Sequence, residues 1–203
     1  MPVANAAARR ERQREELRGA ILDAARELFV TEGVDTVSMR RLARSVGYSP
    51  GTIYLHFTSK EELLRCLVEE AFDTLLGELE ASRAATPLET LKAGLRAYVA
   101  FGLDHPNHYH FAFVLRAPAG PGAYQPHAAF EYLRRCVADC IRTGAIRRTD
   151  EETAAQLLWA AVHGLTSLLI ARPAFPWVER SRLAGELVDA TLRGLAAPQG
   201  EPS

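Results

Sequence analysis

The stretch Ser38–Lys60, SMRRLARSVGYSPGTIYLHFTSK, restricts the possible folds of this chain more than any other part of the sequence. Ser38 is a suitable N-cap for a short helix, and Gly47 stands where such a helix ends in a left-handed residue. The pair Ser49-Pro50 supplies an N-cap and a first helical residue for a second, very short helix. Ser59 then opens a long helix through a Ser-x-x-Glu capping box. The sequence therefore predicts two short helices joined by a tight turn and followed by a long one.

Two short helices joined through a glycine turn form the helix-turn-helix arrangement, whose second helix enters the major groove of DNA. Gly51 and Thr52 keep the start of the second helix slim, and Thr52 offers both a hydroxyl and a methyl group to base edges. We expect base contacts from Thr52 and Arg40, with close approach of the backbone at Gly51. The residues expected to hold phosphates are Ser38, Ser49, Tyr54, His56 and Lys60. On spacing alone, a small helical hairpin with a solvated face is the alternative.

From Ile21 to Leu64 the chain closely resembles the TetR family of bacterial transcriptional regulators. The landmarks are Ala24-Ala25, Leu28-Phe29, Gly33, Leu42-Ala43, Gly47, Ile53-Tyr54, His56-Phe57 and Lys60-Glu61-Leu63-Leu64. This dense match covers roughly a fifth of the chain. It implies a DNA-binding regulator that acts as a dimer, most often a repressor released by a small molecule.

Charge and composition agree with binding of DNA at one end of the chain. Residues 1–60 carry ten Lys/Arg against seven Asp/Glu, and the remaining residues carry fourteen against eighteen. Cys66, Cys136 and Cys140 are an odd number without metal-type pairing, which is typical of a reducing cytoplasm. The sequence has no secretory signal and no long apolar run, so a cytoplasmic protein without a membrane span is expected. Phosphate-loop, nucleophile-elbow and HExxH motifs are absent, so we predict neither an enzyme nor a cofactor.

The rest of the chain shows helical signals and no strand signal, so the predicted fold class is all-α. A three-helix DNA-binding domain over residues 12–58 is followed by a larger helical domain for ligand binding and dimerisation over residues 59–195. Residues 1–11 and 196–203 are expected to be a disordered arm and a disordered tail. The arginines of Arg9–Arg18 either form a basic arm that touches DNA or a solvated helical turn with ion pairs. Helices are expected over residues 12–31, 59–83, 87–103, 108–116, 127–143, 150–171 and 177–195.

The last two helices are apolar on more than one side, which indicates burial against more than the chain's own core. Members of the TetR family dimerise through two C-terminal helices, and two heads read a palindrome with half-sites about 34–36 Å apart. The predicted interface residues are Leu158, Gly164, Leu165, Leu168, Leu187 and Thr191. We expect helices to approach closely at Gly164. A thick core within one copy is the alternative.

The segment Trp159–Leu165, WAAVHGL, resembles the Trp-x-x-x-His-Gly signature of one C-terminal subgroup of the family. Trp159 and His163 are four residues apart and share a helix face. The resemblance implies a mostly apolar effector pocket, for which we predict the lining residues Tyr98, Phe101, Tyr109, Phe113, Trp159 and His163. Aromatic core packing is the alternative for each of them, and a regulator without an effector is the alternative for the whole chain.

Four histidines suggest a metal site, namely His105, His108, His110 and His127. His110 lies about 200° from His108 on a helix and cannot share a face with it. No cysteine accompanies them. We therefore predict no metal site.

Overall fold

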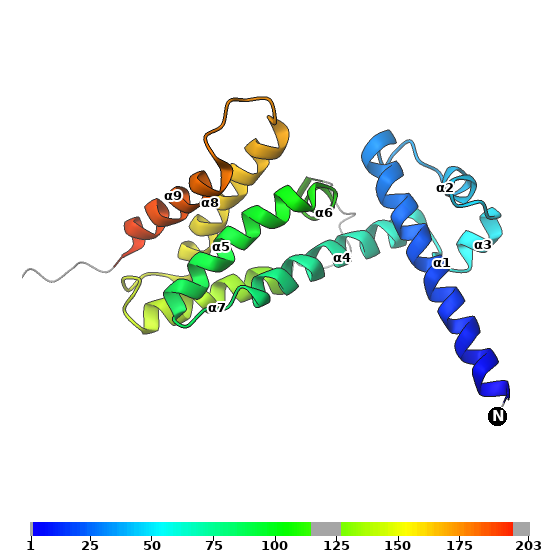
Figure 1. Ribbon diagram of the computed structural model, residues 1–203, viewed down its shortest axis with the longest axis horizontal. Coiled ribbons are helices and arrows are strands. Elements are labelled where there is room, and N and C mark those ends of the chain that lie inside the picture. Colours follow the sequence, from blue (N-terminus) through cyan, green and yellow to red (C-terminus); the bar gives the residue numbers. More distant parts are fainter. Residues whose placement is uncertain (1, 115–126, 197–203) are drawn as a thin grey trace, which may run out of the picture. The chain divides into compact units, whose positions relative to one another are not determined.

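The computed structural model describes residues 2–114 and 127–196, and for residues 2–7 only the backbone. The described elements are helices, with one isolated β-bridge between Ile146 and Ala196. Their bounds are α1 (Pro2–Glu32), α2 (Met39–Val46), α3 (Pro50–Tyr54), α4 (Lys60–Ala81), α5 (Pro87–Asp104), α6 (Pro106–Tyr109), the π-helical segment η1 (His110–Val114), α7 (Ala128–Arg142), α8 (Glu151–Ala171) and α9 (Arg180–Leu195) (Figure 1). The all-α prediction is confirmed.

The chain forms two compact units, and the division falls inside α4. The first unit comprises Met1–Glu69 and His110–Gly120, of which His110–Val114 are described, and the second comprises the rest. The boundary predicted between residues 58 and 59 is therefore about ten residues too early. The reason is that Leu63, Leu64 and Leu67 in the first turns of α4 are buried in the core of the first unit. A three-helix domain of this size needs that extra apolar surface.

The caps predicted for the helix-turn-helix are all present. The hydroxyl of Ser38 accepts from the Arg41 N–H, and Ser49 accepts from the Thr52 N–H. Gly47 has φ +75°, and its N–H reaches the carbonyls of Ala43 and Arg44. Only glycine adopts this backbone without strain, so the sharp turn between α2 and α3 depends on it.

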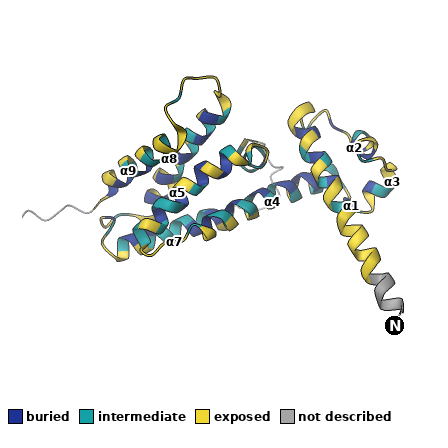
Figure 2. Cartoon of the chain, viewed as in Figure 1, coloured by how far each residue is buried: buried dark blue, intermediate teal, exposed yellow. Residues whose placement is uncertain are grey.

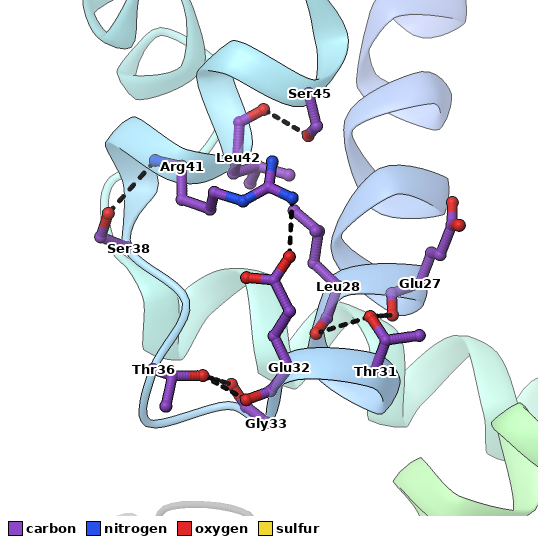
Figure 3. A network of polar contacts seen from close by, with 10 residues as sticks. All are labelled: Glu27, Leu28, Thr31, Glu32, Gly33, Thr36, Ser38, Arg41, Leu42 and Ser45. Atoms are coloured by element: carbon purple, nitrogen blue, oxygen red, sulfur yellow. Dashed lines mark hydrogen bonds and ion pairs between the residues drawn. The ribbon is translucent and has the colours of Figure 1, made fainter.

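The connection from α1 to α2 is held by a small polar network (Figure 3). Arg41 of α2 forms an ion pair of 2.6 Å with Glu32 at the end of α1. The hydroxyl of Thr36 donates to the backbone carbonyls of Glu32 and Gly33. These contacts fix the direction in which α2 leaves α1, and so they position the turn that carries α3.

The first unit packs around α3 and the start of α4. Ile21, Ala25 and Phe29 of α1 are buried, as are Ile53 and Phe57. The Arg18 guanidinium lies 4.7 Å from the centre of the Phe57 ring and donates to Cys66 Sγ at 3.3 Å. This cation–π contact ties α1 to the end of α3 and to α4.

In the second unit, α5 lies among α7, α8 and α9, and α8 also packs on α7 and α9 (Figure 1). Leu91, Leu95, Val99 and Phe101 of α5 are buried in this core. The two helices approach closely at Gly102, where an added Cβ would lie 2.3 Å from Thr166 Cγ2 of α8. A side chain at this position would therefore force the Thr166 side chain or the helices themselves to shift.

Several expected bounds differ from the structure. Helix α1 begins at Pro2, so the prediction of a disordered arm over residues 1–11 is wrong. The sequence ANAAARRERQREEL contains strong helix formers, which carry the helix out to its first residues although Arg9–Glu16 are exposed (Figure 2). The tail predicted over residues 196–203 lies outside the described residues except for Ala196.

Two further differences follow from prolines. The helix expected from His108 to Arg116 starts at Pro106, which suits a first helical position, and changes to η1 at His110. The last helix starts at Arg180 rather than Trp177, with Glu179 as its N-cap. Pro176 leaves the residues after it in a loop that the helical pattern did not reveal.

Among the described residues, α8 alone is long and apolar enough to cross a membrane, and 33% of its apolar window is buried inside the chain. One such helix is weak evidence for a membrane span and does not overturn the expectation that the chain has none. The core helix of a soluble protein passes the same test, so the composition of α8 does not distinguish a membrane span from a core helix.

Candidate functional site

The short helix α3 has small and polar residues at its N-terminus. The hydroxyls of Ser49 and Thr52 lie 3.0 Å apart, so the Thr52 side chain is oriented by the residue that caps its own helix. An added Cβ at Gly51 would have only Ser49 Oγ within 4 Å, at 3.7 Å. The fold itself therefore leaves room for a side chain at this position. This is the result expected if the glycine serves close approach to another molecule.

Large side chains are exposed around α3. Tyr54 is 51% exposed, Leu55 is 77% exposed and Tyr48, which precedes the helix, is 49% exposed. Tyr54 was among the predicted phosphate contacts, whereas Tyr48 and Leu55 were not predicted to contribute.

The other predicted contacts have roles within the fold as well. Ser38 caps α2, and Arg40 is exposed on the first turn of the same helix. The Lys60 ammonium donates to the Val34 carbonyl at 2.9 Å, which ties the start of α4 to the loop after α1. An ammonium has three N–H donors, so this bond uses one of them.

His56 is placed near two arginines of α1. Its Nδ1 is buried without a hydrogen-bond partner among the described residues. Burial lowers the pKa of the His56 imidazole, and the charges of Arg14 and Arg18 lower it further. The imidazole is thereby kept neutral, and the nearby arginines make this end of α3 electropositive.

A polar cluster lies inside the second unit. The hydroxyls of Tyr98 and Tyr109 lie 2.9 and 2.8 Å from His163 Nδ1. Trp159 Nε1 donates to the Tyr98 hydroxyl at 3.3 Å, and the Tyr109 and Ser167 hydroxyls are 2.9 Å apart. The Tyr109 and His163 rings stack with their centres 5.5 Å apart. We call these five side chains the Tyr–His cluster.

The hydrogen bonds of the cluster define the state of His163. One imidazole nitrogen carries either one lone pair or one hydrogen, so Nδ1 cannot serve both hydroxyls fully. Tyr98 accepts from Trp159, so its own proton points to Nδ1, which is then the acceptor. Tyr109 has a second acceptor in the His163 carbonyl at 3.2 Å. We therefore assign the proton of the neutral ring to Nε2.

Burial keeps the cluster neutral. It lowers the pKa of His163 and raises the pKa of both Tyr98 and Tyr109, because each charged form loses its hydration. A neutral, hydrogen-bonded group in an apolar core can orient a ligand without the cost of burying a charge.

The structure brings four of the six predicted ligand residues together, namely Tyr98, Tyr109, Trp159 and His163. Phe101 is fully buried in the core of the same unit. Phe113 belongs to η1 in the first unit. Ser167 and Phe130, whose ring lies edge-on 5.7 Å from Trp159, were not predicted. Ser167 stands four residues after His163, so helical spacing alone was sufficient to identify it.

The predicted interface residues separate into two groups. Leu158 is only 1% exposed within its own chain, so it has no surface to give to a second copy and its prediction is corrected. Gly164 and Leu168 are exposed on α8, and Leu165, Leu187 and Thr191 are half-buried. An added Cβ at Gly164 would meet nothing within 4 Å, so the close approach expected there does not occur within the chain.

The four histidines do not form one cluster. The rings of His105 and His108 lie 5.5 Å apart, edge to face, and His105 Nε2 lies 3.0 Å from Glu78 Oε1. His127 stacks on Phe72 and caps α7. Across residues 2–114 and 127–196, no three His, Cys, Asp or Glu side chains are placed to hold a metal ion.

Two family models match the chain. The model described as "Bacterial regulatory proteins, tetR family" matches residues 21–67. The model described as "Tetracyclin repressor-like, C-terminal domain" matches residues 91–195, which is just over half of the chain. The finer Trp-x-x-x-His-Gly subgroup is not identified by these matches.

Individual proteins agree with the family models. The chain is 45% identical over 51 residues to the HTH-type transcriptional regulator UidR of Escherichia coli K12, a match that covers 25% of this chain and 26% of UidR. A protein of unknown function from Rhodococcus sp. RHA1 has a similar structure, with a TM-score of 0.76 and 28% identity over 89% of this chain and 96% of that one. A regulatory protein of the tetR family from Rhodococcus RHA1 shares the fold with a TM-score of 0.72 and 20% identity, over 90% and 98% of the two chains. With both units matched in this way, the chain belongs to the TetR family of DNA-binding transcriptional regulators.

Proposed function

We propose that this protein is a dimeric repressor that binds a palindromic operator in the cytoplasm and is released by a mostly apolar small molecule. The observation that carries the effector part is the Tyr–His cluster. A core that only had to be stable would gain little from five polar-tipped side chains on α5, α6 and α8, since buried polar groups at best offset their own desolvation. Such convergent polar groups in an apolar surround are typical of ligand sites.

The DNA part of the proposal rests on α3. Thr52 and Arg40 are proposed to contact bases, and Gly51 to allow close approach. The proposed phosphate contacts are Ser38, Ser49, Tyr54, His56 and Lys60. The exposure of Tyr54 and the arginines near His56 support a surface that faces phosphates.

The dimer part rests on α8 and α9. Leu157, Ala160, Gly164, Leu168 and Ala171 of α8 are exposed at spacings of three and four residues, which defines one helix face. We call this face the α8 stripe. Regulators of this family act as dimers, and a second copy that covers the α8 stripe, with Leu165, Leu187 and Thr191 at its edge, accounts for an apolar face that its own chain leaves open.

The proposal is tested by footprinting the protein on the promoters beside its own gene, combined with a metabolite screen that follows operator release. We expect one protected palindrome and at least one apolar compound that abolishes protection. The competing candidate is a regulator that answers only to partner proteins. It would be favoured by a protected site that no compound affects, together with unchanged thermal stability of the second unit across the screen.

A further inference from the structure

The first half of α1 is exposed on all sides. Every residue from 8 to 16 is exposed, and burial begins only with Leu17 and Arg18, which are half-buried. Figure 2 shows this part of α1 as an exposed helix that projects beyond α2 and α3. A helical segment without a buried face contributes little to the core, so its side chains are open to another molecule. We call residues 8–18 the α1 extension.

Three arginines of the α1 extension share one side of the helix. At about 100° per residue, Arg10, Arg14 and Arg18 lie within an arc of about 80°. Ile21 is fully buried and lies in the same arc, which is therefore the side of α1 that meets the rest of the first unit. We call these three residues the arginine row. The glutamates of the extension lie outside the arc, namely Glu11, Glu15 and Glu16.

The inner end of the arginine row lies beside α3. The Arg18 guanidinium is 4.7 Å from the centre of the Phe57 ring, shortly after the end of α3. Burial lowers the pKa of His56, and the charges of Arg14 and Arg18 lower it further, so both arginines lie near this imidazole. Arg10 continues the row by one turn, about 6 Å beyond Arg14. The row therefore runs outward from the end of α3.

The spacing within the row is unfavourable for an isolated helix. Arg10, Arg14 and Arg18 are four residues apart, and like charges at this spacing destabilise a helix. Across residues 2–114 and 127–196, no ion pair joins Arg10 or Arg14 to a carboxylate. A helix that only had to be solvated would gain more from alternating charges along the same side. An anionic partner along the row removes this repulsion.

We propose that Arg10 and Arg14 bind backbone phosphates of the same DNA duplex that receives α3, an inference that rests on the proposed DNA-binding surface. DNA is the anionic partner that fits, because the row is continuous with the residues beside α3. Arg10 and Arg18 are about 12 Å apart along the helix, which corresponds to about three to four base pairs of duplex. The α1 extension has no apolar face, so a membrane surface is the weaker occupant.

The first test compares the two sides of the α1 extension. Arg10→Gln and Arg14→Gln each remove one charge from the row, whereas Arg12→Gln removes one charge about 200° away from Arg10. Arginine and glutamine have similar helix propensities, so α1 should remain intact in all three variants, which circular dichroism checks. Fluorescence anisotropy on the footprinted operator and on a random-sequence duplex is followed over a range of salt concentrations. Each row variant should lower the salt slope by about one per bound protomer, and Arg12→Gln should leave it nearly unchanged.

The second test locates the contacted phosphate. Methylphosphonate linkages replace the phosphates of the operator duplex one at a time by uncharged groups. We expect a position at which this replacement weakens binding of the wild type but has no further effect on Arg10→Gln, because the contact is already lost. The same position should still affect Arg12→Gln.

The outcomes separate this inference from the proposed function. Equal slopes for Arg10→Gln and Arg12→Gln, whether both fall or neither does, would refute the arginine row and leave operator binding by α3 intact. A wild-type protein that protects no operator would refute the proposed function, and the random-sequence duplex would still test the row. Binding of phosphatidylserine vesicles that depends on Arg10, with no effect of Arg10→Gln on DNA, would overturn the assignment to DNA.

Discussion

At the scale of single residues, Gly102 is a position where the core leaves no room for a side chain. An added Cβ would lie 2.3 Å from Thr166 Cγ2 and 3.0 Å from the Tyr109 ring, and both neighbours are buried. We therefore expect Gly102→Ala to lower the free energy of unfolding by about 1–3 kcal/mol, as overpacking of a core does. Urea denaturation followed by circular dichroism measures this change.

Gly164→Ala is the matched control, because a Cβ at Gly164 meets nothing within 4 Å of its own chain. Alanine favours a helix by about 1 kcal/mol over glycine, so this variant should be slightly more stable as a monomer. If the α8 stripe faces a second copy, the same variant should also change the dimer dissociation constant. Equal stability losses for both variants would contradict the assignment of Gly102 as the tight contact.

Three half-buried histidines predict a dependence of stability on pH. Burial lowers the pKa of His163, His110 and His56, so between the lowered values and the ordinary value of about 6.5 the unfolded chain binds more protons than the folded one. Stability should therefore fall as pH drops below about 6.5. Urea denaturation of wild type and His163→Gln between pH 5 and pH 8 measures this fall, which should be shallower in the variant. An equal slope in both proteins would show that His163 contributes nothing.

The sequence predicted local features of single residues well and tertiary ones poorly. Ser38, Gly47 and Ser49 were placed correctly because a cap depends only on its immediate neighbours. Gly102 was missed, because only the packing of α5 on α8 shows that this glycine has close neighbours. That Tyr98, Tyr109, Trp159 and His163 lie together was predicted from helix spacing and the resemblance to the family. The burial of Leu158 required knowledge of which face of α8 meets α5.

At the scale of elements, α3 and the start of α4 are expected to read DNA in different ways. Thr52→Ala should relax discrimination at one base pair, because it removes a hydroxyl and a methyl group from the groove. Lys60→Ala should weaken binding to all sequences about equally and lower the salt slope by about one. Fluorescence anisotropy on operator and random duplexes over a range of salt concentrations measures both effects.

The bond between Lys60 and the Val34 carbonyl adds a second expectation for the same variant. Its loss should lower the free energy of unfolding by about 1 kcal/mol, so stability must be measured beside affinity. A variant that loses stability but keeps the wild-type salt slope would show that Lys60 holds the fold and not a phosphate. Equal losses for Thr52→Ala on operator and random DNA would contradict its role in base reading.

Element bounds were predictable where caps mark them and not where packing sets them. Thr86-Pro87 and Asp150 start α5 and α8 as expected, because their side chains cap the helices. The extension of α1 to Pro2 depends on the helix propensity of the first residues. The expectation of a disordered arm did not take this propensity into account. No capping residue or helix breaker near His110 predicts the change from α6 to η1.

At the scale of the whole molecule, α4 belongs to both units. It runs without a break from Lys60 to Ala81, and the division between the units falls after Glu69. A change in the second unit that moves the far part of α4 therefore also acts on the helix that completes the core around α3. In a dimer on a palindrome, the half-site spacing is fixed by DNA geometry, so a few ångströms of added separation would lose the contacts in one groove.

The proposed release of DNA by an effector must obey thermodynamic linkage. An effector releases DNA only as far as it prefers the state that cannot bind the operator, and a hundredfold preference corresponds to about 2.7 kcal/mol. Burial of an apolar ligand against Trp159 and Tyr98 can supply a free energy of this size. We therefore expect an effector to lower operator affinity, and operator DNA to lower effector affinity by the same factor, as measured by calorimetry in both orders of addition.

Trp159→Ala tests whether the Tyr–His cluster is the site of this coupling. The variant removes the donor to the Tyr98 hydroxyl and the ring that packs on Phe130. We expect it to weaken effector binding and to blunt release of DNA, while operator affinity without effector stays close to wild type. Tyr132→Phe is the control, because Tyr132 is a buried tyrosine of the same unit with no assigned role in the cluster. A Trp159→Ala protein with unchanged effector affinity and full release would place the effector site elsewhere, because a group that contacts the ligand in one state and not the other cannot be removed without changing the coupling free energy.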